Sequence, residues 1–306
     1  MAIMGLPEEE YFSCGHRACA GCACATAVRW ITKAAGRDSI LVESTGCMEV
    51  ISTPYPETAW KLPWIHGAFE NCSAIASGVS AALKAQGLAD KIKVVAFGGD
   101  GATYDIGFGH LSGAFERGED FTYVCYDNEA YMNTGIQRSG ATPFGASTTT
   151  SPSGKESIGK VEWKKDIMHI LAAHGSPYVA SASVGYPADA FRKLKKAMET
   201  RGPTFVNLFA SCPTGWRSDP AKSIEVAKLA VETGSVPLYE IIDGKHVVSP
   251  QSKDLSKLKP VEDYLKVQGR YSHLFKPVRR EKELSMIQDR LKQNLQRLID
   301  LSEKGF

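Results

Sequence analysis

The sequence predicts an α/β fold in which a parallel β-sheet is covered on both faces by helices. Short apolar segments alternate with longer segments of helical periodicity, as in folds built from strand–helix–strand units. Several of the short segments are apolar almost throughout, which is typical of strands buried on both faces. The chain has 306 residues, 43% of them apolar and 23% charged, enough for one large domain or two ordinary ones.

Helices and strands are expected in alternation as far as residue 210. The expected helices are 24–35, 71–87, 106–118, 164–174 and 187–200, and the expected strands are 39–44, 93–99, 121–128, 178–184 and 204–210. Residues 130–160 are rich in Gly, Ser and Thr, and a loop of about 30 residues in a compact domain is usually functional. Residues 236–277 are charged, contain prolines and are weakly periodic, and a charged amphipathic helix is expected over 279–302.

The chain is expected to divide into three parts. An N-terminal segment, 1–35, carries clustered cysteines, and residues 36–215 form the α/β domain. A tail, 216–306, has little core of its own. We therefore expect this tail to lie across the main domain or to dock on another subunit.

Composition excludes several classes of protein. Lys and Arg number 36 against 34 Asp and Glu, and a net charge of +2 is too balanced for a protein whose main work is binding nucleic acid. No apolar run approaches the roughly 20 residues that span a bilayer. The first residues, MAIMGLPEEEYF, place three glutamates after a short apolar start, unlike a secretory signal. We expect a cytoplasmic protein without membrane or nucleic-acid partners.

Glycines and oxygen-bearing side chains follow two of the expected strands. One strand ends in Gly99-Asp100-Gly101 and the next ends at Asn128. Glycines let backbone N–H groups approach phosphate, and the start of the following helix favours negative charge. Carboxylate and amide oxygens suit Mg²⁺. The order GDG, helix, strand, Asn matches the thiamine diphosphate motif, whereas the G-x-G-x-x-G of a dinucleotide fold is not found.

Cysteines form a second signal. The chain has eight, at positions 14, 19, 22, 24, 47, 72, 125 and 212. In a reducing compartment, clustered cysteines more often bind metal or do redox chemistry than form disulfides. Cys19 and Cys22 form a C-x-x-C pair, and Cys47 and Cys212 fall at the ends of expected strands. Four thiolates suit zinc or a [4Fe-4S] cluster, and the spacing alone leaves both open.

With both signals together, the sequence resembles the β subunits of 2-oxoacid:ferredoxin oxidoreductases, most of all those of the pyruvate type (pyruvate synthase). The resemblance lies within residues 15–220. It is carried by the stretches GHRACAGC, STGCMEVISTPYPETAWKLPWIHGAFEN, GGDGATYDIG, YDNEAYMNTGIQRSGATPFGASTTTSP and CPTGWRSDP.

This resemblance implies three cofactors: thiamine diphosphate, Mg²⁺ and a [4Fe-4S] cluster. It implies that the cluster is bound by four cysteines, Cys19, Cys22, Cys47 and Cys212, so that 1–35 becomes a cluster-binding segment. It implies that Mg²⁺ is held by Asp100, the Asn128 side chain and the Ala130 carbonyl. It places Asn133 beside the thiazolium ring and the substrate as a catalytic residue. The other implied cofactor contacts are Gly46, Gly99, Gly101 and Thr134.

The resemblance also implies an enzyme that oxidatively decarboxylates a small 2-oxoacid such as pyruvate and passes electrons singly through the cluster to ferredoxin. A pyrimidine-binding α-type subunit would supply the glutamate that thiamine enzymes require, and a ferredoxin-like subunit would carry further electrons. Departures from the family pattern at Ala23-Cys24 and Gly67 leave the acid open. An oxalate enzyme would need no coenzyme A, whereas a pyruvate enzyme would. A non-redox thiamine-dependent decarboxylase subunit with structural zinc is the further alternative.

Overall fold

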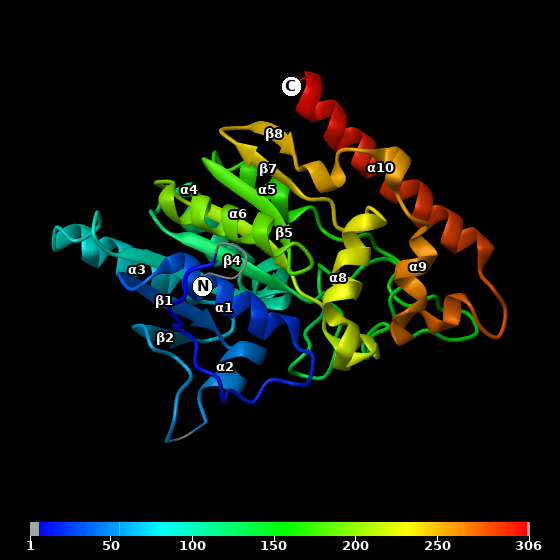
Figure 1. Ribbon diagram of the computed structural model, residues 1–306, viewed down its shortest axis with the longest axis horizontal. Coiled ribbons are helices and arrows are strands. Elements are labelled where there is room, and N and C mark those ends of the chain that lie inside the picture. The colour runs from blue at the N-terminus through cyan, green and yellow to red at the C-terminus, as the bar shows by residue number, and fades with distance from the viewer. Residues whose placement is uncertain (1–5, 55, 305–306) are drawn as a thin grey trace.

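The computed structural model describes residues 6–54 and 56–304, and its centre is an eight-stranded sheet between two layers of helices (Figure 1). The strands are β1 (Ser39–Ser44), β2 (Trp64–Gly67), β3 (Lys93–Gly99), β4 (Thr122–Asp127), β5 (Tyr178–Ser183), β6 (Thr204–Phe209), β7 (Tyr239–Ile242) and β8 (Lys245–Val248). They lie in the order β2-β1-β3-β4-β6-β5-β7-β8. Strands β1 to β6 pair in parallel, so the predicted fold class is confirmed.

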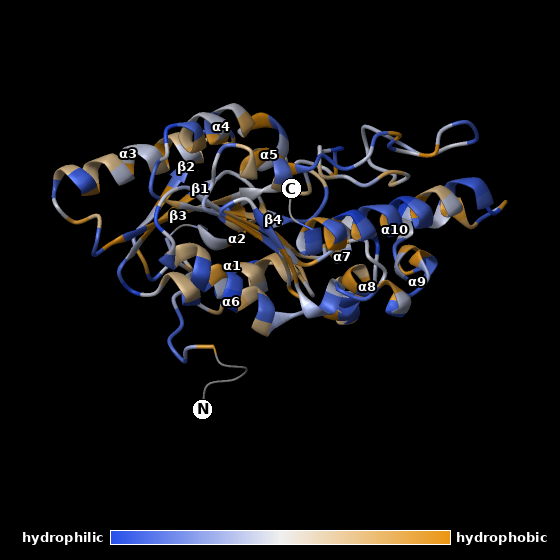
Figure 2. Cartoon of the chain, turned by 90° about the horizontal axis from the view of Figure 1, so that it is seen from above, coloured by the Kyte–Doolittle hydropathy of each residue, from blue (hydrophilic) through white to orange (hydrophobic). Residues whose placement is uncertain are grey.

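Helices cover both faces of the sheet, as Figure 2 shows in the view from above. On one face lie α1 (Ala23–Ala35), α6 (Pro187–Glu199) and α8 (Ser223–Glu232), and on the other lie α3 (Cys72–Ala85), α4 (Phe108–Glu116) and α5 (Ile167–Ala172). The long helix α10 (Glu281–Lys304) contributes buried side chains to both cores. Adjacent residues of β1 enter different cores, because Leu41 packs on the first face and Val42 on the second. The five helices expected up to residue 200 and the expected C-terminal helix are all present.

Shorter helical segments connect the main elements. They are α2 (Cys47–Ser52), η2 (Gly101–Ile106), α7 (Pro213–Trp216), η3 (Pro220–Lys222), η4 (Pro250–Ser252), η5 (Leu255–Lys257), α9 (Val261–Lys266) and η6 (Gly269–Leu274). Three of these, α2, η2 and α7, begin within four residues of the ends of β1, β3 and β6. Their first residues therefore lie at the edge of the sheet where ligands of parallel α/β folds bind.

The weakly periodic stretch 236–277 contains β7 and β8, which extend the sheet as an antiparallel hairpin. The turn is Asp243-Gly244, and both residues have positive φ (48° and 79°), as the two-residue type I′ hairpin turn requires. The stretch IIDGKHVV thus carries a hairpin signal in the sequence itself. Strand β7 binds to β5, so this part of the tail belongs to the core of the sheet.

Glu240 fastens this added hairpin to the main part of the sheet. Its carboxylate accepts hydrogen bonds from Tyr178 Oη (2.9 Å), Arg192 Nη2 (2.8 Å) and Lys196 Nζ (3.1 Å). Burial raises the pKa of Glu240, but these hydrogen bonds outweigh it and lower the pKa to about 2. The folded chain therefore favours the ionised carboxylate.

The expected long loop is ordered by its own interactions. Between β4 and α5 the chain makes only isolated bridges, yet Lys160 is 2% exposed and donates from Nζ to the carbonyls of Ser139 (3.2 Å) and Thr142 (2.5 Å). This contact folds the loop back across the carboxyl ends of the strands. Loop residues therefore help to enclose whatever binds there.

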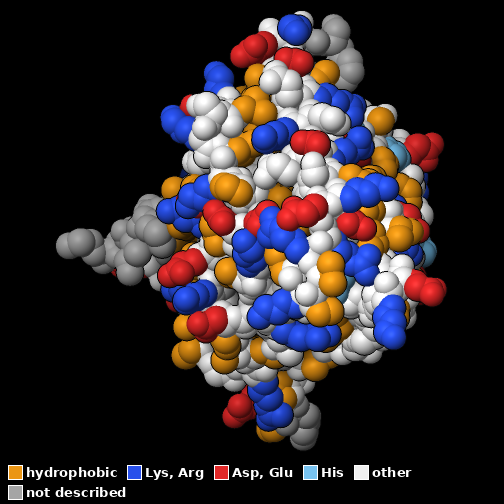
Figure 3. All heavy atoms as spheres, turned by 90° about the vertical axis from the view of Figure 1, so that its right-hand side faces the viewer, with side chains coloured by type: hydrophobic (Ala, Val, Ile, Leu, Met, Phe, Trp, Pro, Cys, Tyr) orange, Lys and Arg blue, Asp and Glu red, His pale blue; other side chains and the backbone are white. Residues whose placement is uncertain are grey.

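The helices and the surface charge bear on whether the chain could bind a membrane or nucleic acid. None of the helices in the two described ranges has the length and apolar character needed to cross a bilayer. Figure 3 shows one face of the molecule, where basic side chains stand among acidic ones rather than in one basic field.

Candidate cofactor site

A cavity opens at the carboxyl ends of β1, β3 and β4. Because these strands are parallel, the segments that follow them meet at one edge of the sheet. The eight positions that the resemblance assigned to thiamine diphosphate, Mg²⁺ and the substrate all line this cavity, together with Cys47, which it assigned to the cluster. The eight are Gly46, Gly99, Asp100, Gly101, Asn128, Ala130, Asn133 and Thr134. Asn133 and Thr134 are exposed at its mouth, whereas Asp100 and Asn128 are buried.

Three oxygen atoms converge inside the cavity. The amide oxygen of Asn128 faces Asp100 Oδ1 at 2.9 Å and the carbonyl oxygen of Ala130 at 3.0 Å. Without a cation this contact is unfavourable, and the amide would have to rotate so that its nitrogen donates to both. Adjacent ligands of an octahedral Mg²⁺ at 2.0–2.1 Å stand about 2.9 Å apart. The donor set and its spacing therefore fit Mg²⁺.

Asp100 lies in an environment that favours a bound cation. Its side chain is 0% exposed, and burial, together with the nearby Asp127 carboxylate, raises the pKa of Asp100 well above its usual range. Ser139 Oγ donates a hydrogen bond to Asp100 Oδ2 at 2.5 Å. A divalent cation would supply the positive charge that the ionised carboxylate lacks.

The three glycines of the cavity make room for aromatic rings. A Cβ atom on Gly101 would lie 2.5 Å from Cε1 of Tyr131, and one on Gly46 would lie 2.7 Å from the Tyr126 hydroxyl. On Gly99 it would lie 3.2 Å from the Tyr126 ring. Each position therefore needs glycine because the backbone runs directly against a ring, which also leaves N–H groups accessible to a phosphate.

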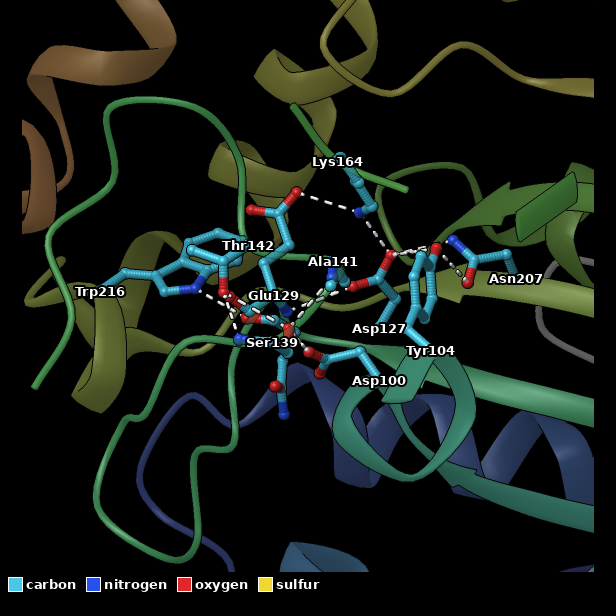
Figure 4. Close-up of polar contacts among 12 residues, drawn as sticks. Asp100, Tyr104, Asp127, Glu129, Ser139, Ala141, Thr142, Lys164, Asn207 and Trp216 are labelled. Atoms are coloured by element: carbon cyan, nitrogen blue, oxygen red, sulfur yellow. Dashed lines mark hydrogen bonds and ion pairs between the residues drawn. The ribbon is translucent and has the colours of Figure 1, made fainter. Parts of the chain in front are cut away.

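Asp127, where many thiamine motifs have a second asparagine, directs its carboxylate toward Lys164, Tyr104 and Asn207 (Figure 4). Its carboxylate accepts hydrogen bonds from Lys164 Nζ (2.5 Å), Asn207 Nδ2 (2.9 Å) and Tyr104 Oη (3.4 Å). Asp127 thus anchors the end of β4 from behind the cavity and leaves Asn128 as the inward-facing residue.

The four cysteines assigned to a cluster gather beside the cavity. Cys22 is the N-cap of α1, Cys47 is the first residue of α2, and Cys212 is the N-cap of α7. Cys19 lies one turn earlier, where its carbonyl accepts the N–H of Cys22 at 3.0 Å. Helix N-termini stabilise thiolates, the form that binds metal. Cys47 also lines the cofactor cavity.

These thiols are near enough to influence one another electrostatically. Burial, followed by the charges of Cys212, Cys22 and Cys19, raises the pKa of Cys47 to about 12. Within residues 6–54 and 56–304, however, no three His, Cys, Asp or Glu side chains gather around one metal-ion position.

Cys24 was not among the cysteines assigned to the cluster, yet it contacts both parts of the site. It is buried, and Asn128 Nδ2 donates to its sulfur at 3.5 Å. A hydrogen bond from Cys24 also lowers the pKa of Cys22 to about 6. The amide that faces Asp100 with its oxygen therefore faces the cysteine group with its nitrogen.

The sequence analysis assigned no role to five other cavity residues, namely Thr45, Phe69, Tyr126, Tyr131 and Met132. Thr45 follows β1 directly, so its place at a strand end was a usable signal. Its hydroxyl lies 2.6 Å from His66 Nε2. Ser139 gave no such signal, because it reaches Asp100 across 39 positions of sequence.

Comparison with known proteins defines the class of the chain first. Residues 44–208 match the family model described as "Thiamine pyrophosphate enzyme, C-terminal TPP binding domain". A solved structure, "2-oxoglutarate:ferredoxin oxidoreductase from Magnetococcus marinus with 2-oxoglutarate, coenzyme A and succinyl-CoA bound", covers 73% of this chain and 82% of its own with a TM-score of 0.57. At 24% identity this likeness shows the fold alone. The chain is a thiamine diphosphate-binding α/β domain with added segments.

Curated relatives then define the family. "Pyruvate synthase subunit PorB" of Methanothermobacter thermautotrophicus is 58% identical over 271 residues, 89% of this chain and 93% of the relative. The subunit of the same name from Methanosarcina barkeri is 55% identical over 92% of this chain and 94% of the relative. "Ketoisovalerate oxidoreductase subunit VorB" of Pyrococcus abyssi is 46% identical over 97% and 95%. The chain belongs to the β-subunit family of 2-oxoacid:ferredoxin oxidoreductases, and the resemblance seen in the sequence is confirmed.

Proposed function

We propose that the chain is the β subunit of a cytoplasmic pyruvate:ferredoxin oxidoreductase that uses thiamine diphosphate, Mg²⁺ and a [4Fe-4S] cluster. The observation that carries the proposal is the convergence of the Asp100, Asn128 and Ala130 oxygens in a cavity that Cys47 also lines. A pyrophosphate–metal site and a thiol group thus share one wall. The relatives named for pyruvate synthase favour pyruvate as the acid.

The residues of the cavity have separate tasks in this proposal. Asp100, Asn128 and Ala130 hold Mg²⁺, and Gly99 and Gly101 offer backbone N–H groups to the pyrophosphate. Thiamine diphosphate, when bound, supplies the nucleophilic carbon and the electron sink for decarboxylation of a 2-oxoacid. Asn133, exposed at the mouth, would orient the acid by hydrogen bonding, while Thr134 and Gly46 border the cofactor.

The cysteines would bind the cluster through which electrons leave the cofactor. Four thiolates are the ligand set of a [4Fe-4S] cluster. Cys22, Cys47 and Cys212 lie at the N-termini of three helices with Cys19 close by, and the β-subunit family to which the chain belongs supports the cluster over zinc. A second cavity borders Cys19 and Cys22 and opens to solvent, so electrons could leave on that side toward ferredoxin or a ferredoxin-like subunit.

Other subunits would complete the enzyme. A pyrimidine-binding α-type subunit would supply the glutamate that activates the aminopyrimidine ring. Large apolar side chains on elements that border the cavity are exposed in this chain: Val50 on α2 (50%), Ile65 on β2 (37%) and Ile106 on η2 (50%). They support docking of such a subunit over the cavity mouth. Residues 216–306 remain a proposed docking segment.

Anaerobic turnover of the assembled complex tests the proposal. Dye reduction is measured with pyruvate, 2-ketoisovalerate and oxalate, each with and without coenzyme A, together with iron and sulfide analysis. We expect pyruvate to be the preferred acid, turnover to depend on coenzyme A, and four iron atoms per β subunit beyond those of other subunits. Turnover of oxalate without coenzyme A, or zinc in place of iron, would contradict it. Full activity of this chain alone would refute the proposal that another subunit completes the active site.

A further inference from the structure

Glu129 stands between two of the proposed Mg²⁺ ligands in a conformation that side-chain-bearing residues rarely adopt. Its φ is +67°, in the left-handed region that favours glycine. In this turn the Asn128 amide oxygen and the Ala130 carbonyl oxygen come within 3.0 Å of each other. The Glu129 side chain points away from Asp100, as Figure 4 shows. The unusual backbone angle is therefore what directs the two flanking oxygens to one point.

Two basic side chains hold the Glu129 carboxylate on the side that faces away from Asp100. Arg270 Nη2 donates to Glu129 Oε2 at 2.5 Å, and both side chains are 3% exposed. Lys164 Nζ lies 3.3 Å from Glu129 Oε1. Burial of such an ion pair is costly unless each partner is well bonded, and here Arg270 Nε also donates to Gln268 Oε1 at 2.9 Å. The pair is thus fully engaged rather than a loose surface contact.

The backbone of the turn is held by the same group of residues. Thr142 Oγ1 donates to the Glu129 carbonyl at 2.7 Å, and Trp216 Nε1 donates to the Asn128 carbonyl at 2.9 Å. The guanidinium of Arg270 lies 4.1 Å from the centre of the Trp216 ring. Arg270 therefore braces the turn twice, through Glu129 and through the indole that binds Asn128.

We propose that Glu129 and Arg270 are positioning residues for the metal, whose ion pair holds the 128–130 turn in the left-handed form that brings the Asn128 and Ala130 oxygens together. The inference rests on the proposed function, because it presupposes that these oxygens bind Mg²⁺. Arg270 belongs to η6 in the C-terminal part of the chain. That part is then a component of the cofactor site, in addition to any docking role.

A purely structural ion pair would fasten η6 to the body without affecting the metal. The two roles are separated by replacements that treat the backbone angle differently. Alanine and glycine at 129 both remove the carboxylate, but glycine adopts φ near +67° without strain and alanine does not. A positioning role therefore predicts a larger loss of Mg²⁺ affinity for Glu129→Ala than for Glu129→Gly.

The test measures the dissociation constant of Mg²⁺ at saturating thiamine diphosphate in the purified complex, by tryptophan fluorescence, with Mn²⁺ and its paramagnetic spectrum as a second probe. Groups that orient metal ligands typically contribute roughly 10- to 100-fold in affinity. We expect losses of that size for Glu129→Ala and Arg270→Met, and smaller ones for Glu129→Gly and Arg270→Lys. Arg270→Lys keeps the charge, so it also serves if Arg270→Met does not fold.

The matched control is Lys193→Met, which breaks another buried ion pair, Lys193 with Asp189 at 2.7 Å, within helix α6 and far from the turn in sequence. It should leave Mg²⁺ affinity unchanged. Unaltered affinity in Glu129→Ala and Arg270→Met, or an equal loss in Lys193→Met, overturns the inference. If the wild-type complex itself binds no Mg²⁺ with thiamine diphosphate, the proposed function fails instead.

Discussion

Replacing Asp100 by asparagine should have opposite effects on stability and on cofactor binding. The carboxylate is wholly buried beside Asp127, and this environment disfavours its ionised form when no metal is present. Even with the Asn128 amide rotated to donate to it, the charge remains without a cation at the same point. The substituted amide would keep the hydrogen bond from Ser139 and lose the charge. The metal-free variant should therefore be more stable than the metal-free wild type.

The chain length sets how large a shift in Tm each change in the free energy of unfolding produces. Removing a poorly compensated buried charge is worth about 1–3 kcal/mol in the free energy of unfolding. An unfolding entropy of about 2.1 cal/mol/K per residue over 306 residues makes 1 kcal/mol equal to about 1.6 °C in Tm. We expect Tm to rise by about 2–5 °C in the metal-free variant. Ligand at 100 times its dissociation constant adds about 2.7 kcal/mol, or about 4 °C, to the wild type only.

Thermal unfolding of both proteins, with a chelator and with Mg²⁺ plus thiamine diphosphate, measures these shifts. The visible absorbance of the cluster should be the same in both, because Asp100 is not one of its proposed ligands. A lower Tm of the variant in chelator would show that Asp100 serves the fold. A full ligand-induced rise in Tm would show that it does not bind the metal. Either result refutes the reasoning.

Three further predictions concern other parts of the chain. Gly101→Ala should weaken thiamine diphosphate binding in a titration, because the added Cβ would lie 2.5 Å from the Tyr131 ring. Unchanged affinity would mean that the Tyr131 ring can move aside without affecting the cofactor site. Glu240→Gln should lower the free energy of unfolding at pH 7 by about 2 kcal/mol, after a discount for partly exposed partners. Since the pKa of Glu240 is lowered from 4.5 to about 2, this difference should be complete above pH 4.5 and disappear as the pH falls toward 2; Tm values across this range check it. Cys212→Ala should abolish the visible absorbance of the cluster while Cys125→Ala, a core thiol, should retain it; equal spectra would exclude Cys212 as a ligand.

Most of the sheet could be predicted because its strands are set by local patterns. The segments 39–44 and 93–99 were expected with the bounds that the structure has, since continuous apolar runs between turns have few other solutions. Strand β2 was not expected, because its four residues, Trp64–Gly67, are mostly exposed at the edge of the sheet and show no buried run. Edge strands depend on a neighbour for their pairing, and that neighbour is not visible in the local sequence.

Some residues of the candidate site could likewise be predicted from the sequence, and others could not. Asp100 and Asn128 could be placed together because each follows a parallel strand, and parallel strands end at the same edge. Ser139 and Arg270 could not, because their contacts with Asp100 and Glu129 join positions 39 and 141 residues apart. Nothing in the residues around them marks these partners.

The sequence by itself determined the α/β class, the strand ends that would meet, and the residue types able to bind phosphate, a divalent cation and a metal cluster. These properties follow from hydrophobic periodicity and from glycines and ligands within a few residues of a strand. Only the tertiary structure decided which way each group faces: the Asn128 amide toward Asp100, Asp127 toward Lys164, and Glu129 back toward a C-terminal arginine. Orientation depends on packing between distant segments, because a buried polar group takes the direction in which its partner lies.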